Sequence, residues 1–210
     1  MSEEKEFRFE CKRCGNCCSD KNTIVNVTYN DILRIKDALE LNLDETNHIL
    51  SFYIFDKEPT EEDKKKMVIS PVETERGKAF VGLRKNPDGS CYFYDKENKR
   101  CRIYNARPNF CRTFPFSFSI SDKTAKKLEN LIEIKSTEKA KEYCQGIDKD
   151  SPLINKEKWL KLGKETLEDL NKNYYVMQKW NKSVQNKEIE PNAKIFLRII
   201  LNIEEEEKDN

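Results

Sequence analysis

Residues 10–20 read ECKRCGNCCSD and place four of the chain's eight cysteines within eight positions. The spacing is C-x2-C-x2-C-C, so Cys17 and Cys18 are neighbours. Cysteines two residues apart point into one small volume where the backbone turns, which suits ligation of one ion or cluster. This stretch predicts a fold that is organised around a metal centre.

The remaining cysteines lie far along the chain. Cys91 and Cys101 flank DKENK, the turn of a predicted hairpin, and the segment IYNARPNFCRTFPF follows them. A hairpin can bring distant thiols close together, so all eight are candidate metal ligands: Cys11, Cys14, Cys17, Cys18, Cys91, Cys101, Cys111 and Cys144.

Composition excludes binding by bulk charge. The 210 residues include 39 Lys and Arg against 38 Asp and Glu, so no overall field attracts nucleic acid or anionic lipid. The opening MSEEKEFRFE has no apolar h-region, and the apolar runs are too short for a membrane span. We therefore expect a cytoplasmic protein with no nucleic-acid or membrane partner.

That compartment favours metal over disulfides. Thiols in a reducing cytosol usually stay reduced, and a cluster of them is more often a metal site than a disulfide framework. Disulfides remain the alternative, because intracellular bridges occur in hyperthermophiles and the chain is rich in Lys, Glu and Ile.

Two helices and a strand are predicted after the cysteine run. TIVNV, residues 23–27, has the character of a strand. Thr28 or Asn30 can cap a helix that continues to residue 41, and Asp44 can cap a second helix over residues 45–55. The helices are expected to cover a sheet, with residues 59–66 as a charged connector.

From Met67 the sequence becomes β-like. Short segments rich in β-branched and aromatic residues alternate with turns, and together they predict an antiparallel meander. The predicted strands are residues 67–74, 78–85, 90–95, 100–104, 113–120 and 131–135. TEKAKEYCQG is predicted as a short helix or turn that delivers Cys144.

The C-terminal part is predicted to be helical. A near-heptad pattern from Asn155 to Lys187 combines Leu160, Leu167 and Tyr174 with Gly163, Leu170, Met177 and Val184. We interpret it as a helix packed on its own domain; a coiled coil that binds a protein partner is the alternative. A helix over 192–203 and an acidic tail follow. The expected organisation is a cysteine domain over 1–150, a helical region over 151–204 and a tail over 205–210, in an α+β fold.

The thiol spacing favours iron–sulfur chemistry over a zinc finger. C-x2-C-x2-C with a remote fourth cysteine is a common arrangement for four-iron clusters. A zinc ribbon repeats the C-x2-C pair, which this chain does not, and its one histidine, His48, lies in an apolar stretch. Because adjacent side chains are expected to diverge, Cys17 and Cys18 are predicted to serve two different metals or to bridge within a polynuclear site.

The cysteine pattern resembles the CxxCxxCC family, also called YkgJ-type zinc- or iron-chelating proteins. The matching stretches are CKRCGNCC, then C-x9-C-x-IY-x2-RP-x2-CR-x-FPF from Cys91 to Phe116, then CQG at Cys144. The resemblance implies binding of a metal or an iron–sulfur cluster, with the four-iron type favoured and zinc as the alternative. It covers roughly residues 7–146 and leaves out the helical C-terminal third.

The same resemblance suggests a second class of function. The family's larger relatives include flagellin lysine N-methylases, which carry a similar cysteine domain. This chain has no glycine-rich dinucleotide loop, and its spacing differs from the C-x3-C-x2-C of radical SAM enzymes. Lysine methylation therefore comes second to redox, electron transfer or metal handling, beside a structural zinc-binding interaction module.

Basic residues near the cysteines have a predicted role. Four thiolates around Zn²⁺ or a four-iron cluster leave a net charge of about −2. Arg107 and Arg112 match the family pattern, and we expect them to offset this charge and to donate hydrogen bonds to sulfur. Gly15 is expected to take a positive φ, while Pro108 and Pro115 stiffen the chain on either side of Cys111.

Overall fold

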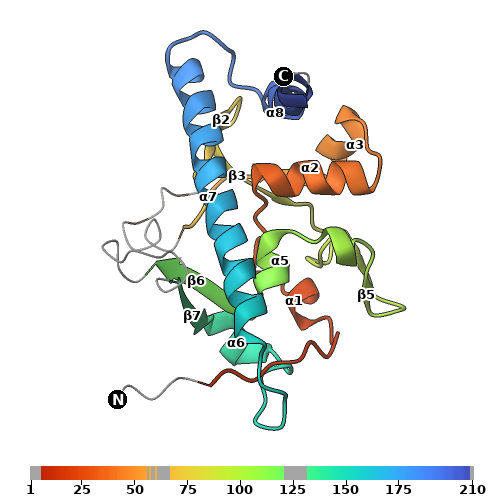
Figure 1. Cartoon of the computed structure of the whole chain (residues 1–210). Coiled ribbons are helices and arrows are strands. Elements are labelled where there is room, and N and C mark those ends of the chain that lie inside the picture. Colours follow the sequence, from red (N-terminus) through yellow and green to blue (C-terminus); the bar gives the residue numbers. More distant parts are fainter. Residues whose placement is uncertain (1–5, 56, 58–59, 61–66, 121–131, 209–210) are drawn as a thin grey trace.

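The computed structural model describes residues 6–55, 57, 60, 67–120 and 132–208. It combines helices with small antiparallel sheets and confirms the α+β class. In Figure 1 the long helix α7 (Lys156–Gln185) runs the length of the molecule, and the other elements lie along it. The connector expected at residues 59–66 lies outside the described residues, apart from Thr60.

The first predicted helix forms, and the second is only partly right. Helix α2 (Tyr29–Ala38) starts at Thr28, whose side chain completes a capping box. Helix α3 (Leu43–Ile49) is capped by Asn42 and not by Asp44. It stops after seven residues, where a helix to residue 55 was expected.

The end of that expected helix is a strand. Strand β1 (Leu50–Tyr53) pairs antiparallel with β3 (Gly77–Leu83), so that Phe52 lies opposite Val81. Aromatic residues favour strands when a partner strand is present. Tertiary pairing therefore overrides an apolar run that is also compatible with a helix.

The largest sheet has the strand order β1-β3-β2, where β2 is Val72–Thr74. Residues 23–27, which were predicted as a strand, follow the same edge of β3 as β2 does. They hydrogen-bond to the part of β3 that lies beyond the end of β2. Val27 N donates to Val81 O at 3.2 Å, and Leu83 N donates to Val25 O at 2.9 Å. The chain leaving the cysteine run is thus tied to the sheet.

The single meander that the sequence predicts is instead divided among separate sheets. Strands β4 (Tyr94–Asp95) and β5 (Arg100–Cys101) form a two-residue ladder, and β6 (Phe116–Ile120) pairs with β7 (Ile132–Ser136). The chain after β5 turns into the 3-10 helix η1 (Tyr104–Ala106) and so cannot continue the ladder toward β6. The other short helices are α1 (Asn16–Ser19), α5 (Asn109–Thr113) and α6 (Glu138–Tyr143).

The C-terminal helices pack on the rest of the chain. Helix α7 begins one residue after the predicted start, with Asn155 as its N-cap, and buries one face against α2, α5 and the sheets. Tyr174, which the heptad pattern placed on the packed seam, is 48% exposed. Helix α8 (Ala193–Lys208) continues through acidic residues that were expected to form a tail, because Glu and Lys are good helix formers.

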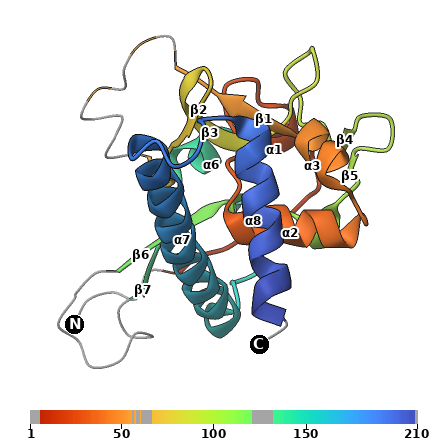
Figure 2. The same ribbon diagram turned by 90° about the horizontal axis from the view of Figure 1, so that it is seen from above.

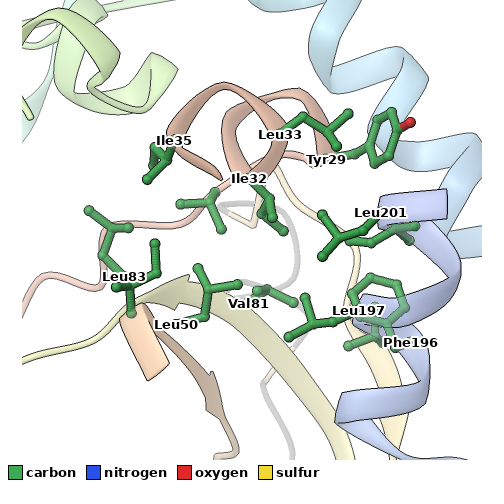
Figure 3. Close-up of a cluster of buried hydrophobic side chains, with 14 of the residues drawn as sticks. Tyr29, Ile32, Leu33, Ile35, Leu50, Val81, Leu83, Phe196, Leu197 and Leu201 are labelled. Atoms are coloured by element: carbon green, nitrogen blue, oxygen red, sulfur yellow. The ribbon is translucent and has the colours of Figure 1, made fainter. Parts of the chain in front are cut away.

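One hydrophobic core unites the N-terminal and C-terminal parts. Figure 3 shows side chains of α2, of the β1-β3 sheet and of α8 meeting in it, among them Ile32, Val81 and Phe196. Figure 2 shows α8 between α7 and α3, and the rings of Trp180 and Phe196 join α7 to α8 at 5.3 Å. Among the described residues, no helix has the length and apolar character needed to cross a membrane.

Candidate metal centre

All eight cysteines are free thiols, and separate elements carry them. Helix α1 holds Cys17 and Cys18, strand β5 ends at Cys101, and helix α5 holds Cys111. Cys144 caps the C-terminus of α6. In Figure 1, α1 and α5 lie next to one another beside the lower half of α7.

Main-chain and side-chain hydrogen bonds bring distant cysteines to the N-terminal run. Cys91 N donates to Cys18 O at 2.8 Å, and the pairing of Tyr94 with Cys101 places β5 beside this junction. Asn16 Nδ2 donates to Tyr143 O at 3.0 Å, which holds the end of α6 against α1. The hairpin and α6 therefore deliver thiols to the same region, as the sequence predicts.

The two neighbouring cysteines face one another, contrary to the expectation that their side chains diverge. Their sulfur atoms are 4.0 Å apart. Two thiolates on one tetrahedral ion, with metal–sulfur bonds of about 2.3 Å, stand ~3.8 Å apart. The pair can therefore contribute to one centre without a large movement.

The contact between the two sulfurs makes them chemically unequal. The hydrogen bond with Cys18 lowers the pKa of Cys17 to about 7, and the positive charge of Arg107 acts in the same direction. The same hydrogen bond, followed by burial, raises the pKa of Cys18. Of this pair, Cys17 is the thiol that ionises first near neutral pH.

The thiols from the hairpin and α5 lie within electrostatic reach of this pair. Burial raises the pKa of Cys91, Cys101 and Cys111, and the charges of the neighbouring thiols raise them further. A bound cation would relieve both penalties, because it stabilises the thiolate form. The donor chemistry of this five-thiol group, Cys17, Cys18, Cys91, Cys101 and Cys111, therefore fits a metal.

The other three cysteines are Cys11, Cys14 and Cys144. Burial raises the pKa of Cys144, and the charges of Cys14 and Cys17 raise it further. Cys17 thus lies within electrostatic reach of both sets of thiols. Cys11 is exposed.

The two arginines of the motif point to different places. Arg107 lies over the ring of Tyr104 at 3.8 Å, and its charge opposes the effect of burial on the pKa of Cys101 and Cys111. Arg112 contacts Asn109 Oδ1 at 3.3 Å and Glu165 of α7 at 3.6 Å. Arg107 is the arginine whose charge acts on the thiols, whereas Arg112 joins α5 to α7.

Gly15 has the predicted positive φ, and the structure shows why a glycine is needed there. Its φ is +81°, and a Cβ there would lie 1.9 Å from Tyr94 Oη. The loop that carries the cysteines therefore packs directly on the hairpin that carries Cys91 and Cys101. The guanidinium of Arg13, in the same loop, lies 5.1 Å from the ring of Tyr104.

The only histidine takes no part in this group. His48 Nδ1 lies 3.0 Å from Arg84 Nη1, and its ring packs on Tyr92. In the part of the chain that the structure describes, no three Cys, His, Asp or Glu side chains already have the arrangement of a metal site. Ligation would therefore draw the thiols closer than they lie here.

Sequence reasoning missed the polar residues that support these loops. Buried Asp31 and Asn109 form a hydrogen-bonded network with the partly buried Asp169 at α5, and Asn16 and Tyr94 brace α1. For Asn109 a signal exists, because it lies between Pro108 and Cys111 in the motif RPNFCR. Asp31 and Asp169 lie on helices outside any such motif, so the sequence gives no signal for them.

The fold and the gathered thiols together define a class, an α+β protein that carries the donors for a metal. The family model described as "CxxCxxCC: putative zinc- or iron-chelating domain" matches residues 10–145. The chain belongs to this family, which supports metal binding.

One similar protein is an uncharacterized protein, MJ0661, of Methanocaldococcus jannaschii, with 30% identity over 112 residues. The match covers 53% of this chain and 47% of that protein, so the chain spans about half of its relative's length. No solved structure matches the chain.

Proposed function

We propose that the protein binds an iron–sulfur cluster, of the four-iron type, through its cysteines, and acts in electron transfer or in the handling of metal or clusters. The observation that carries this proposal is the five-thiol group. Five free thiols act electrostatically on one another there, and Cys144 lies within electrostatic reach of Cys17.

The kind of donors and their spacing support a thiolate-bound metal centre. One structural zinc ion takes four ligands, fewer than the thiols gathered here. The donors are all sulfur, with the histidine engaged elsewhere, and thiolate sets select zinc, copper(I) or iron–sulfur clusters. A four-iron cluster also takes four cysteine ligands, so the proposal of iron–sulfur rests on the C-x2-C-x2-C spacing with remote cysteines and not on the number of thiols.

The surroundings support a redox or transfer role. An iron–sulfur cluster supplies one-electron chemistry, and nearby charge and solvent exposure tune its potential. Here Arg107 provides positive charge beside the thiols, and Cys11 and Cys17 are exposed. Exposed thiols leave the centre within reach of a partner or an incoming cluster.

Structural zinc is the second candidate. The eight cysteines could divide into two groups of four, with Cys144 within electrostatic reach of Cys14 and Cys17. Two zinc ions would then serve as crosslinks for short elements, and the protein would act as an interaction module.

A single preparation separates the two. Protein purified without oxygen should be brown, absorb broadly in the near-ultraviolet and visible range, and contain iron and acid-labile sulfide in equal amounts. A colourless protein that contains zinc and no sulfide would refute the iron–sulfur proposal. Expression with added zinc is the control, because a true cluster site should still yield iron and sulfide.

A further inference from the structure

Helix α5, which carries Cys111, is too short to be stable without contacts from other elements. It has five residues, and its N-cap, Pro108, makes no side-chain capping bond. Isolated helices of this length are unstable in water, because nucleation is costly and few hydrogen bonds follow. Other elements must therefore fix the position of Cys111.

Helix α2 holds the main chain at the start of α5. Asp31 is fully buried, and its Oδ1 accepts a hydrogen bond from Asn109 N at 3.0 Å. It thereby satisfies an amide that the short helix leaves without an internal acceptor. Arg34, which is paired with Asp31, donates to Arg107 O at 3.0 Å. The backbone is thus held on both sides of Pro108.

Helix α7 holds the side chain at the same point. Asn109 is 1% exposed, and its Nδ2 donates to Asp169 Oδ2. Asp169 Oδ1 accepts from Asn30 Nδ2 at 2.6 Å. Asp169 therefore joins α2 and α5 to α7, and it lies outside the residues that the family model matches.

We propose that Asp169 is a positioning residue for the metal centre, because it fixes Asn109 and, through α5, the sulfur of Cys111. The inference rests on the proposed metal centre but not on the identity of the metal. The inference gives helix α7 a part in the site, because α7 would fix the position of Cys111 on helix α5.

The hydrogen-bond pattern suggests a substitution that tests the bond between Asn109 and Asp169. Asp169→Asn keeps the shape and, in the orientation that preserves the bond from Asn30, places an amide donor against the amide donor of Asn109. If Asn109 turns its amide over, its donor then faces Arg112 Nη1, which donates to Asn109 Oδ1 at 3.3 Å. The exchanged pair Asn109→Asp with Asp169→Asn restores an acceptor opposite a donor and leaves the bond from Asn30 intact.

The measurement is the rate at which the full-length protein, purified with its metal, releases it to excess EDTA. We expect Asp169→Asn to release metal at least about 10-fold faster, the usual cost of losing an outer partner of a ligand. Glu168→Gln changes the exposed neighbour on the same helix and should behave as wild type. The exchanged pair should return close to the wild-type rate.

Melting of the metal-free proteins separates positioning from general stability. A merely structural role would lower the metal-free melting temperature and leave the release rate unchanged, and this result would overturn the proposal. If Asp169→Asn does not fold, the exchanged pair decides: wild-type release supports the proposal, and release 10-fold faster refutes it. A wild-type protein without metal would instead refute the proposed function, before any variant is compared.

Discussion

Gly15 offers the most direct test of how the cysteine loop packs on the hairpin. Its φ of +81° is a left-handed conformation, and an added Cβ would lie 1.9 Å from Oη and 2.5 Å from Cζ of Tyr94. Both atoms lie at the end of a rigid phenol group, which cannot fold away from the new methyl group. Gly15→Ala should therefore strain the backbone and also push the loop away from the hairpin.

Gly77 is a matched control. Its φ is +99°, and nothing lies within 4 Å of a Cβ built on it. Both alanine variants should lose about 1–2 kcal/mol through the left-handed backbone. Gly15→Ala should lose about 1–3 kcal/mol more, the usual cost of overpacking.

Chemical unfolding measures these costs, and metal analysis of the same samples measures the site. We expect Gly15→Ala to carry less metal per chain, since Gly15 lies between Cys14 and Cys17, and Gly77→Ala to carry the wild-type amount. Tyr94→Ala removes the obstacle, so a double-mutant cycle should show favourable coupling with Gly15→Ala. Equal stability loss and full metal in both glycine variants would refute the packing argument.

Three further results are expected. Chelation of the metal, or Cys14→Ser, should lower the melting temperature, because metal binding is coupled to folding; identical melting of the metal-free protein would contradict this. Deletion from Asn155 onward should expose the apolar core and cause aggregation visible by light scattering, whereas a monomeric truncation that keeps its metal would show a separable arm. Cys17→Ser and Cys18→Ser should lose metal to the same extent if both sulfurs belong to one centre; half-filled variants with different spectra would indicate two sites.

The sequence was informative where local chemistry decides the structure. The Thr28 capping box and the Asn155 cap mark the starts of α2 and α7 through side chains that bond the adjacent backbone. The positive φ of Gly15 follows from the same kind of reasoning. These features depend on a few neighbouring residues, so they can be read without the rest of the fold.

The sequence was misleading where distant partners decide. The run from Leu50 to Tyr53 has no feature that rejects a helix, and only its pairing with β3 makes it a strand. The division of the predicted meander depends likewise on which strands find one another. The polar network of Asp31, Asn109 and Asp169 joins three elements that no local pattern connects.

The geometry of Cys17 and Cys18 has a physical cause that changes how the site is understood. Neighbouring side chains on an extended segment point to opposite faces, but on a helix they are rotated by only about 100°. Both cysteines lie on the four-residue helix α1. Their sulfurs therefore meet at 4.0 Å. Cys17 also lies within electrostatic reach of Cys144 and of Cys111. The 4.0 Å separation lets both neighbouring sulfurs serve one centre, which the divergent geometry expected from the sequence would not allow.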